Sequence, residues 1–535
     1  MLFLFLVPLL ALGRIVPLIG EPPSMPVEGN VEMAFDEAGF RSLKFGGVEF
    51  LQDGAPQIEE VTFTDAEGRE TSGDAACTTT VNVANRVLSQ NFAWGSAACQ
   101  YDATATRLNI TVTVTNATQN TLSGFNLKLA LLKFPAKPAE YDGGTPLLAH
   151  TVGEPGVVTM SYGTGTLALV NEEVTKPLLA GFPWAYDRPA STVFPLKLNT
   201  GRVWNYPPHT PFITRPIAPG ASEQFMLSLR FGPPVAKAMA LAPDVFQKFA
   251  AAYPARLAWS DHRSIGTVYL STAAAGWAKN PRGWFNDATV DVTTPAGLAL
   301  FRQSLLNSAD RTVAILQAMD SQGAITWDIE GQQFPHAVSY IGDPRLAETL
   351  APELTGVVDE YFQRFRDAGL RVGVTVRPQQ LGVAADGKSG DQKEVADPEK
   401  LLAEKMSYAR NRWGASIFYI DSNGDPSWPL DAAVIERLAA AFPDCLLIPE
   451  SQNLRYYATT APYDELRRGY ESAPPLVRRV YSGAFGVINI ADTELTPHHA
   501  ALVDAVRAGD ILLYHSWFND APNAEVKQIY VEAAQ

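Results

Sequence analysis

The N-terminal part of the chain shows the two-residue alternation of half-buried strands. RLNITVTVTNAT, residues 107–118, alternates polar and apolar positions, and LSGFNLKLALLKF, residues 122–134, follows it after a polar turn. A period of two places successive side chains on opposite faces of a sheet. Short apolar runs separated by Gly, Pro and Asn clusters continue to residue 234. Many short strands with turns between them predict a β-sandwich over residues 29–234.

A second pattern follows, in which continuous apolar runs alternate with segments of helical period. Helical spacing over residues 242–259 predicts a helical linker within residues 235–262. The predicted strands after it are residues 265–272, 324–331, 371–378, 416–423, 445–451, 485–492 and 510–517. The predicted helices between them are residues 295–318, 345–368, 398–413, 430–442 and 496–508. Repeated strand–helix units with apolar strands indicate a parallel sheet covered by helices.

These units predict a (β/α)₈ (TIM) barrel over residues 263–535. Seven predicted strands mean that one strand is missed or that the barrel is incomplete. A doubly wound sheet is the alternative, but the first strand–helix turn is not Gly-rich and no phosphate-binding loop is found. The whole chain is therefore predicted to be a multidomain β plus α/β protein, with the β-sandwich preceding the barrel.

Polar and charged residues follow nearly every predicted strand of the barrel, at the ends that form the active face of this fold. They are Asp328 and Glu330 after the second strand, Arg377 after the third, Asp421 after the fourth, Glu450 and Gln452 after the fifth, Asp492 after the sixth, and His515 and Trp517 in the seventh. A single Asp after a strand is commonly a helix N-cap, and Thr496 before Pro497 competes with Asp492 for that role. Several carboxylates at one mouth repel each other, and proteins keep such clusters mainly for catalysis or cation binding.

Paired carboxylates suit a glycoside hydrolase or a transglycosidase, in which one carboxyl group protonates the leaving oxygen and another acts as nucleophile or base. We predict Asp421 as nucleophile or base and Glu450 as general acid, because the apolar residues 446–449 lead into Glu450 and would raise its pKa. Asp492 is the second candidate for the acid. The predicted sugar contacts are Asp328, Glu330, Arg377, Gln452, His515, Trp517, Trp284 and His336. For Trp284 and His336, in aromatic loops after the first two strands, packing of the loops onto the barrel is the alternative.

The segment FYIDSNG, residues 418–424, resembles the fourth-strand element of the retaining α-galactosidase and α-glucosidase superfamily. Those enzymes are TIM-barrel glycoside hydrolases with an N-terminal β-sandwich. The resemblance, which covers the architecture and this one motif, implies the nucleophile role for Asp421. It also implies an acid/base role for the Asp after the sixth strand, and Asp492 is the positional match. Tyr419 stands where those enzymes usually have Lys.

Two other functions remain open from the sequence. One is a non-catalytic carbohydrate-binding or surface protein on a degenerate barrel, whose carboxylates would be paired with Arg or Lys. The other is a metal-dependent hydrolase, with ligands from Asp328, Glu330, Asp421, Glu450 and His515. His is a common ligand of catalytic zinc, but the first predicted barrel strand of this chain contains VYLST without His. The chain also has no CxxC or HxxxH spacing, so we predict neither a metal nor another cofactor.

The net charge of the chain limits the classes of partner, and its N-terminal residues predict the compartment. A net charge of −15 argues against nucleic acid or an anionic membrane as partner. The apolar run of residues 2–12 leads into the small-x-small pattern Ala11-Leu12-Gly13, which is typical of a cleavage site. It predicts a secretory leader within residues 1–28, and hence a secreted or periplasmic, envelope-associated protein. A membrane anchor or a misassigned start is the alternative. Cys77 and Cys99 could pair in an oxidising compartment, whereas Cys445 is predicted to be buried.

Overall fold

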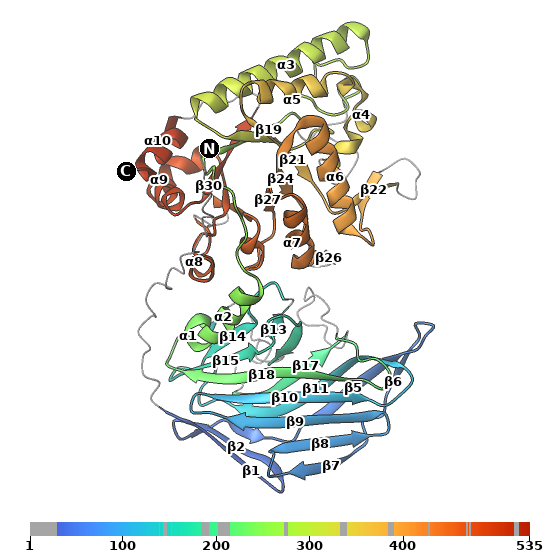
Figure 1. Cartoon of the computed structure of the whole chain (residues 1–535), viewed down its shortest axis with the longest axis vertical. Helices are drawn as coiled ribbons and strands as arrows, with labels where there is room; N and C mark the ends of the chain where they lie inside the picture. Colours follow the sequence, from blue (N-terminus) through green and yellow to red (C-terminus); the bar gives the residue numbers. More distant parts are fainter. Residues whose placement is uncertain are drawn as a thin grey trace, which may run out of the picture.

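The computed structural model describes residues 29–138, 140–142, 147–150, 152–182, 192–201, 215–271, 277–331, 340–383, 390–425, 428–466, 469, 472–517 and 524–535. The predicted leader and His336 lie outside these residues. Figure 1 shows an N-terminal body built of strands and a C-terminal body of strands and helices, with α2 between them.

Two large antiparallel sheets form the N-terminal body. One runs in the order β12 (Glu140–Asp142), β14 (Val157–Ser161), β15 (Thr166–Asn171), β18 (Ser222–Gly232), β10 (Arg107–Asn116), β9 (Gly95–Ala103), β8 (Val87–Phe92) and β7 (Cys77–Asn82). The other runs in the order β13 (Leu147–His150), β16 (Leu178–Gly181), β17 (Val193–Thr200), β11 (Thr121–Lys133), β5 (Gln57–Thr64) and β6 (Glu70–Ser72), and β4 (Leu51–Asp53) also pairs with β11. A small sheet contains β1 (Val31–Asp36), β2 (Gly39–Phe45) and β3 (Val48–Glu49).

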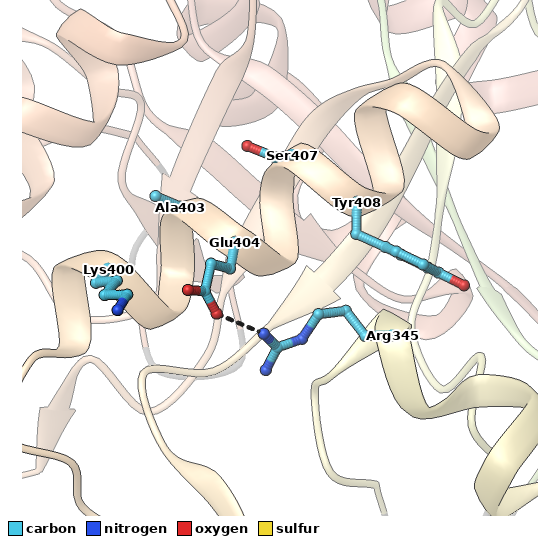
Figure 2. Close-up of a pocket in the computed structure, with 6 residues that line it drawn as sticks. All are labelled: Arg345, Lys400, Ala403, Glu404, Ser407 and Tyr408. Atoms are coloured by element: carbon cyan, nitrogen blue, oxygen red, sulfur yellow. Dashed lines mark hydrogen bonds and ion pairs between the residues drawn. The ribbon is translucent and has the colours of Figure 1, made fainter.

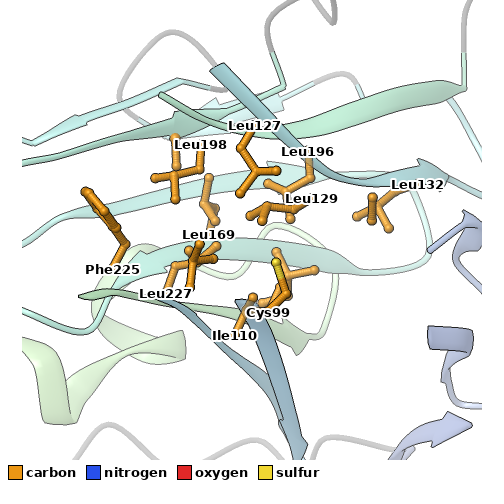
Figure 3. Packing of buried hydrophobic residues seen from close by; sticks show 14 of the residues in the cluster. Cys99, Ile110, Leu127, Leu129, Leu132, Leu169, Leu196, Leu198, Phe225 and Leu227 are labelled. Carbon is orange, nitrogen blue, oxygen red and sulfur yellow. The ribbon is translucent and has the colours of Figure 1, made fainter. Parts of the chain in front are cut away.

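The core of this body lies between the two large sheets. Along β10, buried residues alternate with partly exposed ones, as the sequence pattern predicts. Figure 3 shows the leucines of β11 and β17 meeting apolar side chains of β10, β15 and β18 across the core. The predicted β-sandwich is confirmed.

All three cysteines are free thiols. Cys99 on β9 points into the sandwich core, where burial raises the pKa of its thiol to about 12. Cys77 on β7 is exposed. The suggested Cys77–Cys99 disulfide is therefore absent, because the two side chains lie in different environments on strands that β8 separates. Cys445 is buried, as predicted.

Eight parallel strands form the C-terminal barrel. In chain order they are β19 (Ile265–Tyr269), β20 (Gly323–Thr326), β21 (Arg371–Val376), β24 (Ala415–Ile420), β27 (Leu446–Pro449), β28 (Tyr463–Glu465), β29 (Val487–Ile490) and β30 (Ile511–Trp517). β30 pairs with β19, so the ring closes except between β27 and β28, where the described residues form no ladder. The predicted TIM barrel is confirmed with all eight strands.

The strand missed by the sequence pattern is β28, which has only three residues. Such a short run carries no detectable period. Its presence shifts the numbering of the last two strands, because the strand predicted as sixth is the seventh and the strand predicted as seventh is the eighth.

Helices cover the outside of the barrel. They are α3 (Pro295–Ala318), α4 (Ala347–Leu350), α5 (Val358–Asp367), α6 (Pro398–Trp413), α7 (Ala432–Ala441), α8 (Pro475–Val480), α9 (Asp492–Arg507) and α10 (Ala524–Ala533). The 3₁₀ turns whose residues are all described are η1 (Pro344–Leu346), η2 (Pro352–Leu354) and η3 (Tyr456–Ala458). Two hairpins are β22 (Gln380–Val383) with β23 (Gly390–Lys393), and β25 (Gly424–Asp425) with β26 (Trp428–Pro429). None of the helices in the described part of the chain is long and apolar enough to cross a membrane.

Two predicted helices differ from the structure. The helix predicted over residues 345–368 is split into η1, α4, η2 and α5, because Pro352 cannot continue a helix from the preceding turn. The helix predicted from residue 496 begins at Asp492 as α9, with Pro497 inside it. Glu494 accepts a hydrogen bond from the backbone N–H of Ala491 at 2.9 Å, which caps the earlier start. Thr496 is therefore not the cap.

A shared apolar cluster joins the two bodies. It combines residues of β15, the helices α1 (Ala238–Leu241) and α2 (Pro243–Ala252), and barrel residues near η3 and α8. In Figure 1, α7 and α8 lie on the side of the barrel that faces the sandwich.

Candidate active site

Asp421 directly follows β24 and is almost completely buried, with 5% of its surface exposed. Its Oδ2 accepts hydrogen bonds from Arg377 Nε at 2.6 Å and Tyr340 OH at 2.5 Å, and Arg377 Nη2 lies 2.5 Å away. Three donor contacts on one oxygen suit an ionised carboxylate. Asp421 is therefore a charged side chain held in one orientation.

Arg377 and Tyr340 hold each other as well as Asp421. The Arg377 guanidinium lies 4.3 Å from the Tyr340 ring centre, and its Nη1 donates to the Tyr340 carbonyl at 2.8 Å. Trp327 Nε1 donates to the Tyr340 hydroxyl at 2.6 Å. Burial and the Asp421 charge raise the pKa of Tyr340 well above its usual value. Tyr340 therefore remains a neutral donor to Asp421.

Glu450 follows β27 and is only partly buried. Its Oε2 accepts a hydrogen bond from the backbone N–H of Ser422 at 2.8 Å. Burial, the Asp421 charge and a hydrogen bond with the Asp421 carboxyl group raise the pKa of Glu450 to about 7. At neutral pH Glu450, which lies beside the Asp421–Arg377 ion pair, therefore holds a proton for much of the time.

The turns that carry the two carboxylates are joined directly. Ser422 adopts a left-handed backbone conformation, with a φ of 56°, and its N–H points at Glu450. Asn423 Oδ1 accepts from the backbone N–H of Ser451 at 2.9 Å. A Cβ on Gly424 would lie 2.2 Å from Ser451 Cβ. Glycine is therefore required at position 424, because the two turns approach too closely for a side chain.

Aromatic rings fill the barrel beside the pair. Ring centres of Trp327 and Tyr419 are 4.2 Å apart, those of Tyr419 and Tyr463 are 5.1 Å apart, and those of Tyr269 and Trp327 are 5.6 Å apart. Burial, followed by the charge of Asp421, raises the pKa of Tyr419 well above its usual value. Where the similar superfamily usually has a cationic Lys, this chain has a neutral, buried phenol.

Asp328 joins the ends of the first two barrel strands. Its Oδ1 accepts from the N–H of Leu270 at 2.9 Å, and its Oδ2 accepts from the N–H of Ser271 at 2.9 Å and from the Ser271 hydroxyl. Burial raises its pKa to about 7 against these hydrogen bonds. Both carboxyl oxygens of Asp328 accept hydrogen bonds from the protein, so in this structure Asp328 holds the end of β19 against the end of β20.

A second buried cluster supports the turn after β21. Glu330 Oε1 accepts from the N–H of Asp343 at 2.6 Å. Lys405 of α6 is fully buried, and its Nζ donates to the carbonyls of Arg377 at 2.7 Å and Gln379 at 2.6 Å. Burial lowers the pKa of Lys405 to about 8. Sequence reasoning missed Lys405, because a Lys on an amphipathic helix usually faces solvent.

Gln452 bridges the open seam of the barrel. Its Nε2 donates to Asp464 Oδ1 and lies 3.4 Å from the Tyr463 carbonyl, so it connects the segment after β27 with β28. Asp464 is buried, and burial raises its pKa to about 7. Sequence reasoning missed Asp464 and Glu465 together with their strand. The available signal was that residues 452–484 separate two predicted strands without a predicted helix between them.

The position of Asp492 in the barrel does not match the position of the acid/base Asp expected from the resemblance. It follows β29, which is the seventh strand, whereas the superfamily places its acid/base Asp after the sixth. Asp492 is the first residue of α9, and its side chain lies outside the description. The count of strands was wrong because β28 was missed.

The structure describes the remaining predicted sugar contacts to different extents. Trp284 is fully buried, packs 5.4 Å from Phe301 and donates from Nε1 to Glu353 at 2.6 Å, which is the packing alternative. His515 and Trp517 pair through their backbones with β19, and their side chains lie outside the description.

Figure 2 shows a hollow on the outer side of α6, where Arg345 and Glu404 form an ion pair at 2.8 Å. Its lining residues do not include the Asp421–Glu450 pair. Within the described ranges, no three His, Cys, Asp or Glu residues are grouped to hold a metal ion.

Comparison with known proteins supports the fold. No protein-family model and no curated protein matches the sequence. The structure is similar to an alpha-N-acetylgalactosaminidase from Bifidobacterium bifidum in complex with GalNAc, with a TM-score of 0.52 and 11% identity over 94% of this chain and 91% of that chain. Two alpha-galactosidases match with lower scores. The one from Geobacillus stearothermophilus has a TM-score of 0.43 and 11% identity over 89% and 74% of the two chains. The one from Lactobacillus brevis has a TM-score of 0.44 and 11% identity over 89% and 72%.

At this identity, the likeness to the Bifidobacterium bifidum structure shows a shared fold. The expected resemblance to TIM-barrel glycoside hydrolases with an N-terminal β-sandwich is therefore confirmed at the level of the fold.

Proposed function

We propose that this chain is a glycoside hydrolase whose reaction uses Asp421 and Glu450. The observation that carries the proposal is the pairing of a charged, oriented Asp421 with a partly exposed Glu450 whose pKa is about 7. The two groups lie at the carboxyl ends of neighbouring barrel strands, where this fold places its catalytic residues. Two carboxyl groups with different proton affinities provide one acid and one base.

Each carboxyl group has one task in this mechanism. Glu450 donates its proton to the glycosidic oxygen, so that the bond to the anomeric carbon breaks and the leaving group departs as an alcohol. Asp421, held by Arg377 and Tyr340, attacks the anomeric carbon or deprotonates the attacking water. Because the two groups follow the neighbouring strands β24 and β27, one glycosidic bond can reach both of them.

The structural neighbours suggest the first substrates to test. The neighbours described above are named as acting on α-galactosides and α-N-acetylgalactosaminides. We propose that this chain cleaves an α-linked sugar of this kind.

A substrate screen with matched variants tests the proposal. Aryl α- and β-glycosides and polysaccharides are incubated with the full chain, with and without chelator. Asp421→Asn and Glu450→Gln should each lower kcat by about 10²–10⁴-fold on the cleaved substrate. Glu404→Gln, in the outer hollow, is the control and should retain activity. Full activity in both site variants would show that the assignment is wrong, and loss with chelator alone would favour the metal-dependent alternative.

One observation favours a second candidate, a non-catalytic carbohydrate-binding protein. Asp421 is paired with Arg377 and has little exposed surface, which is the arrangement expected when carboxylates serve structure. This candidate predicts that α-galactosides bind with no turnover. Isothermal titration together with product analysis by chromatography separates the two functions.

A further inference from the structure

The β-sandwich contacts the segment that carries Glu450. The backbone N–H of Leu454 donates to Glu154 Oε1 at 2.6 Å, and the N–H of Arg455 donates to the Gly153 carbonyl at 2.9 Å. Glu154 and Gly153 belong to the turn between β13 and β14 of the sandwich. Leu454 and Arg455 lie four and five positions after Glu450 in the barrel.

Packing on both sides reinforces these two hydrogen bonds. Leu454, Tyr457 and Ala458 share an apolar cluster with β15 and α2. The Arg455 guanidinium lies 4.0 Å from the ring centre of Tyr253 and forms an ion pair with Glu436 of α7 at 2.5 Å. In Figure 1, α7 lies on the side of the barrel that faces the sandwich, and α2 lies between the two bodies.

The other end of the segment is tied to the candidate active site. Glu450 accepts from the Ser422 N–H, and the Ser451 N–H donates to Asn423. Tyr457 also reaches back, because its hydroxyl donates to Gln452 Oε1 at 2.7 Å. Residues 450–457 are thus held at the carboxylate pair and at the sandwich, with a side-chain link between the two ends.

From this geometry we infer that Glu154 of the sandwich is a positioning residue for Glu450, acting through the segment of residues 450–457. The inference rests on the proposed function, in which Glu450 is the acid. The Glu154 carboxylate is the sandwich's side-chain ligand for the buried backbone N–H of Leu454. When this ligand is removed, the segment gains freedom, and Glu450 is no longer held in the position from which it can protonate the glycosidic oxygen.

Variants of Glu154 in the full chain test the inference. Glu154 lies in a turn outside the strands of the sandwich, although burial of its carboxyl group raises its pKa to about 7. The melting temperature of each variant therefore has to match that of the wild type before the rates are compared. Glu154→Ala should lower kcat about 10–100-fold on the aryl glycoside that the wild type cleaves, with little change in KM. Glu154→Gln keeps an acceptor oxygen and should stay within about threefold of the wild type. The Asp244→Ala variant is the control, because Asp244 joins α2 to Arg230 of the sandwich without contacting residues 450–457.

Hydrogen–deuterium exchange supplies a readout that does not depend on activity. The peptide containing Leu454 should exchange faster in Glu154→Ala than in the wild type or Asp244→Ala, at an unchanged melting temperature. Wild-type kcat together with unchanged exchange in Glu154→Ala would overturn the inference. Full activity in Glu450→Gln would instead overturn the proposed function, and the exchange experiment would still report whether Glu154 holds the segment.

Discussion

Gly424→Ala tests whether close contact between two turns creates the Asp421–Glu450 pair. Gly424 lies three residues after Asp421, and Ser451 directly follows Glu450. An added Cβ would lie 2.0 Å from Ser451 Oγ and 2.2 Å from Ser451 Cβ. Ser451 Cβ is attached to the backbone, so no side-chain rotation removes the overlap.

The magnitude follows from ordinary contact distances. Carbon atoms in contact lie about 3.5–4.0 Å apart, so the turns would have to separate by about 1.3–1.8 Å. The Asn423–Ser451 hydrogen bond, now 2.9 Å long, would then break. Overpacking costs about 1–3 kcal/mol and the lost hydrogen bond about 0.5–1.5 kcal/mol, so the free energy of unfolding should fall by about 2–4 kcal/mol. A displacement of this size should also lower kcat by about 10²-fold.

Urea unfolding and steady-state kinetics measure both effects. Gly483→Ala is the matched control, because no atom lies within 4 Å of a Cβ at that position. The double variant Gly424→Ala with Ser451→Gly removes both overlapping atoms and should recover most of the stability and activity. Wild-type stability and kcat in Gly424→Ala alone would refute the reasoning. A double variant no better than the single one would show that contact with Ser451 is not the cause.

Three further outcomes are expected. Activity should fall as pH rises through about 7, because Glu450 donates a proton and its pKa is about 7, and a pH–rate profile of Glu450→Gln should lack this limb. Arg377→Leu leaves the Asp421 carboxylate buried without its cation and should cost about 3–5 kcal/mol in urea unfolding. Adding Asp421→Asn should recover much of that loss, and strict additivity of the two changes would contradict the ion pair. A thiol reagent should label Cys77 in the native protein and reach Cys99 only after unfolding.

Much of the fold is readable from local patterns. The α3 and α6 bounds match the predicted helices 295–318 and 398–413, since Pro starts each helix and Gly414 ends α6 in a left-handed conformation. The sequence pattern did not predict β28, because three residues carry no period. As a result, the last two strands were numbered one too low, and Asp492 was matched to the wrong strand of the superfamily. The burial of Lys405 was not predicted, because it depends on contact with the turn after β21 and not on the pattern of residues within α6.

The sequence by itself determined the two architectures and the placement of carboxylates at strand ends. Period and turn residues act over a few positions, and a strand that ends on Asp421 or Glu450 does so whatever surrounds it. Only the tertiary structure decided the hydrogen-bond partners, the orientation and the pKa of each carboxyl group. Arg377 and Tyr340 orient Asp421, Asp328 is bound by backbone donors, and Glu450 retains a proton near neutral pH. The pKa values and orientations of these groups depend on burial and on partners from distant segments, which meet only when the barrel closes.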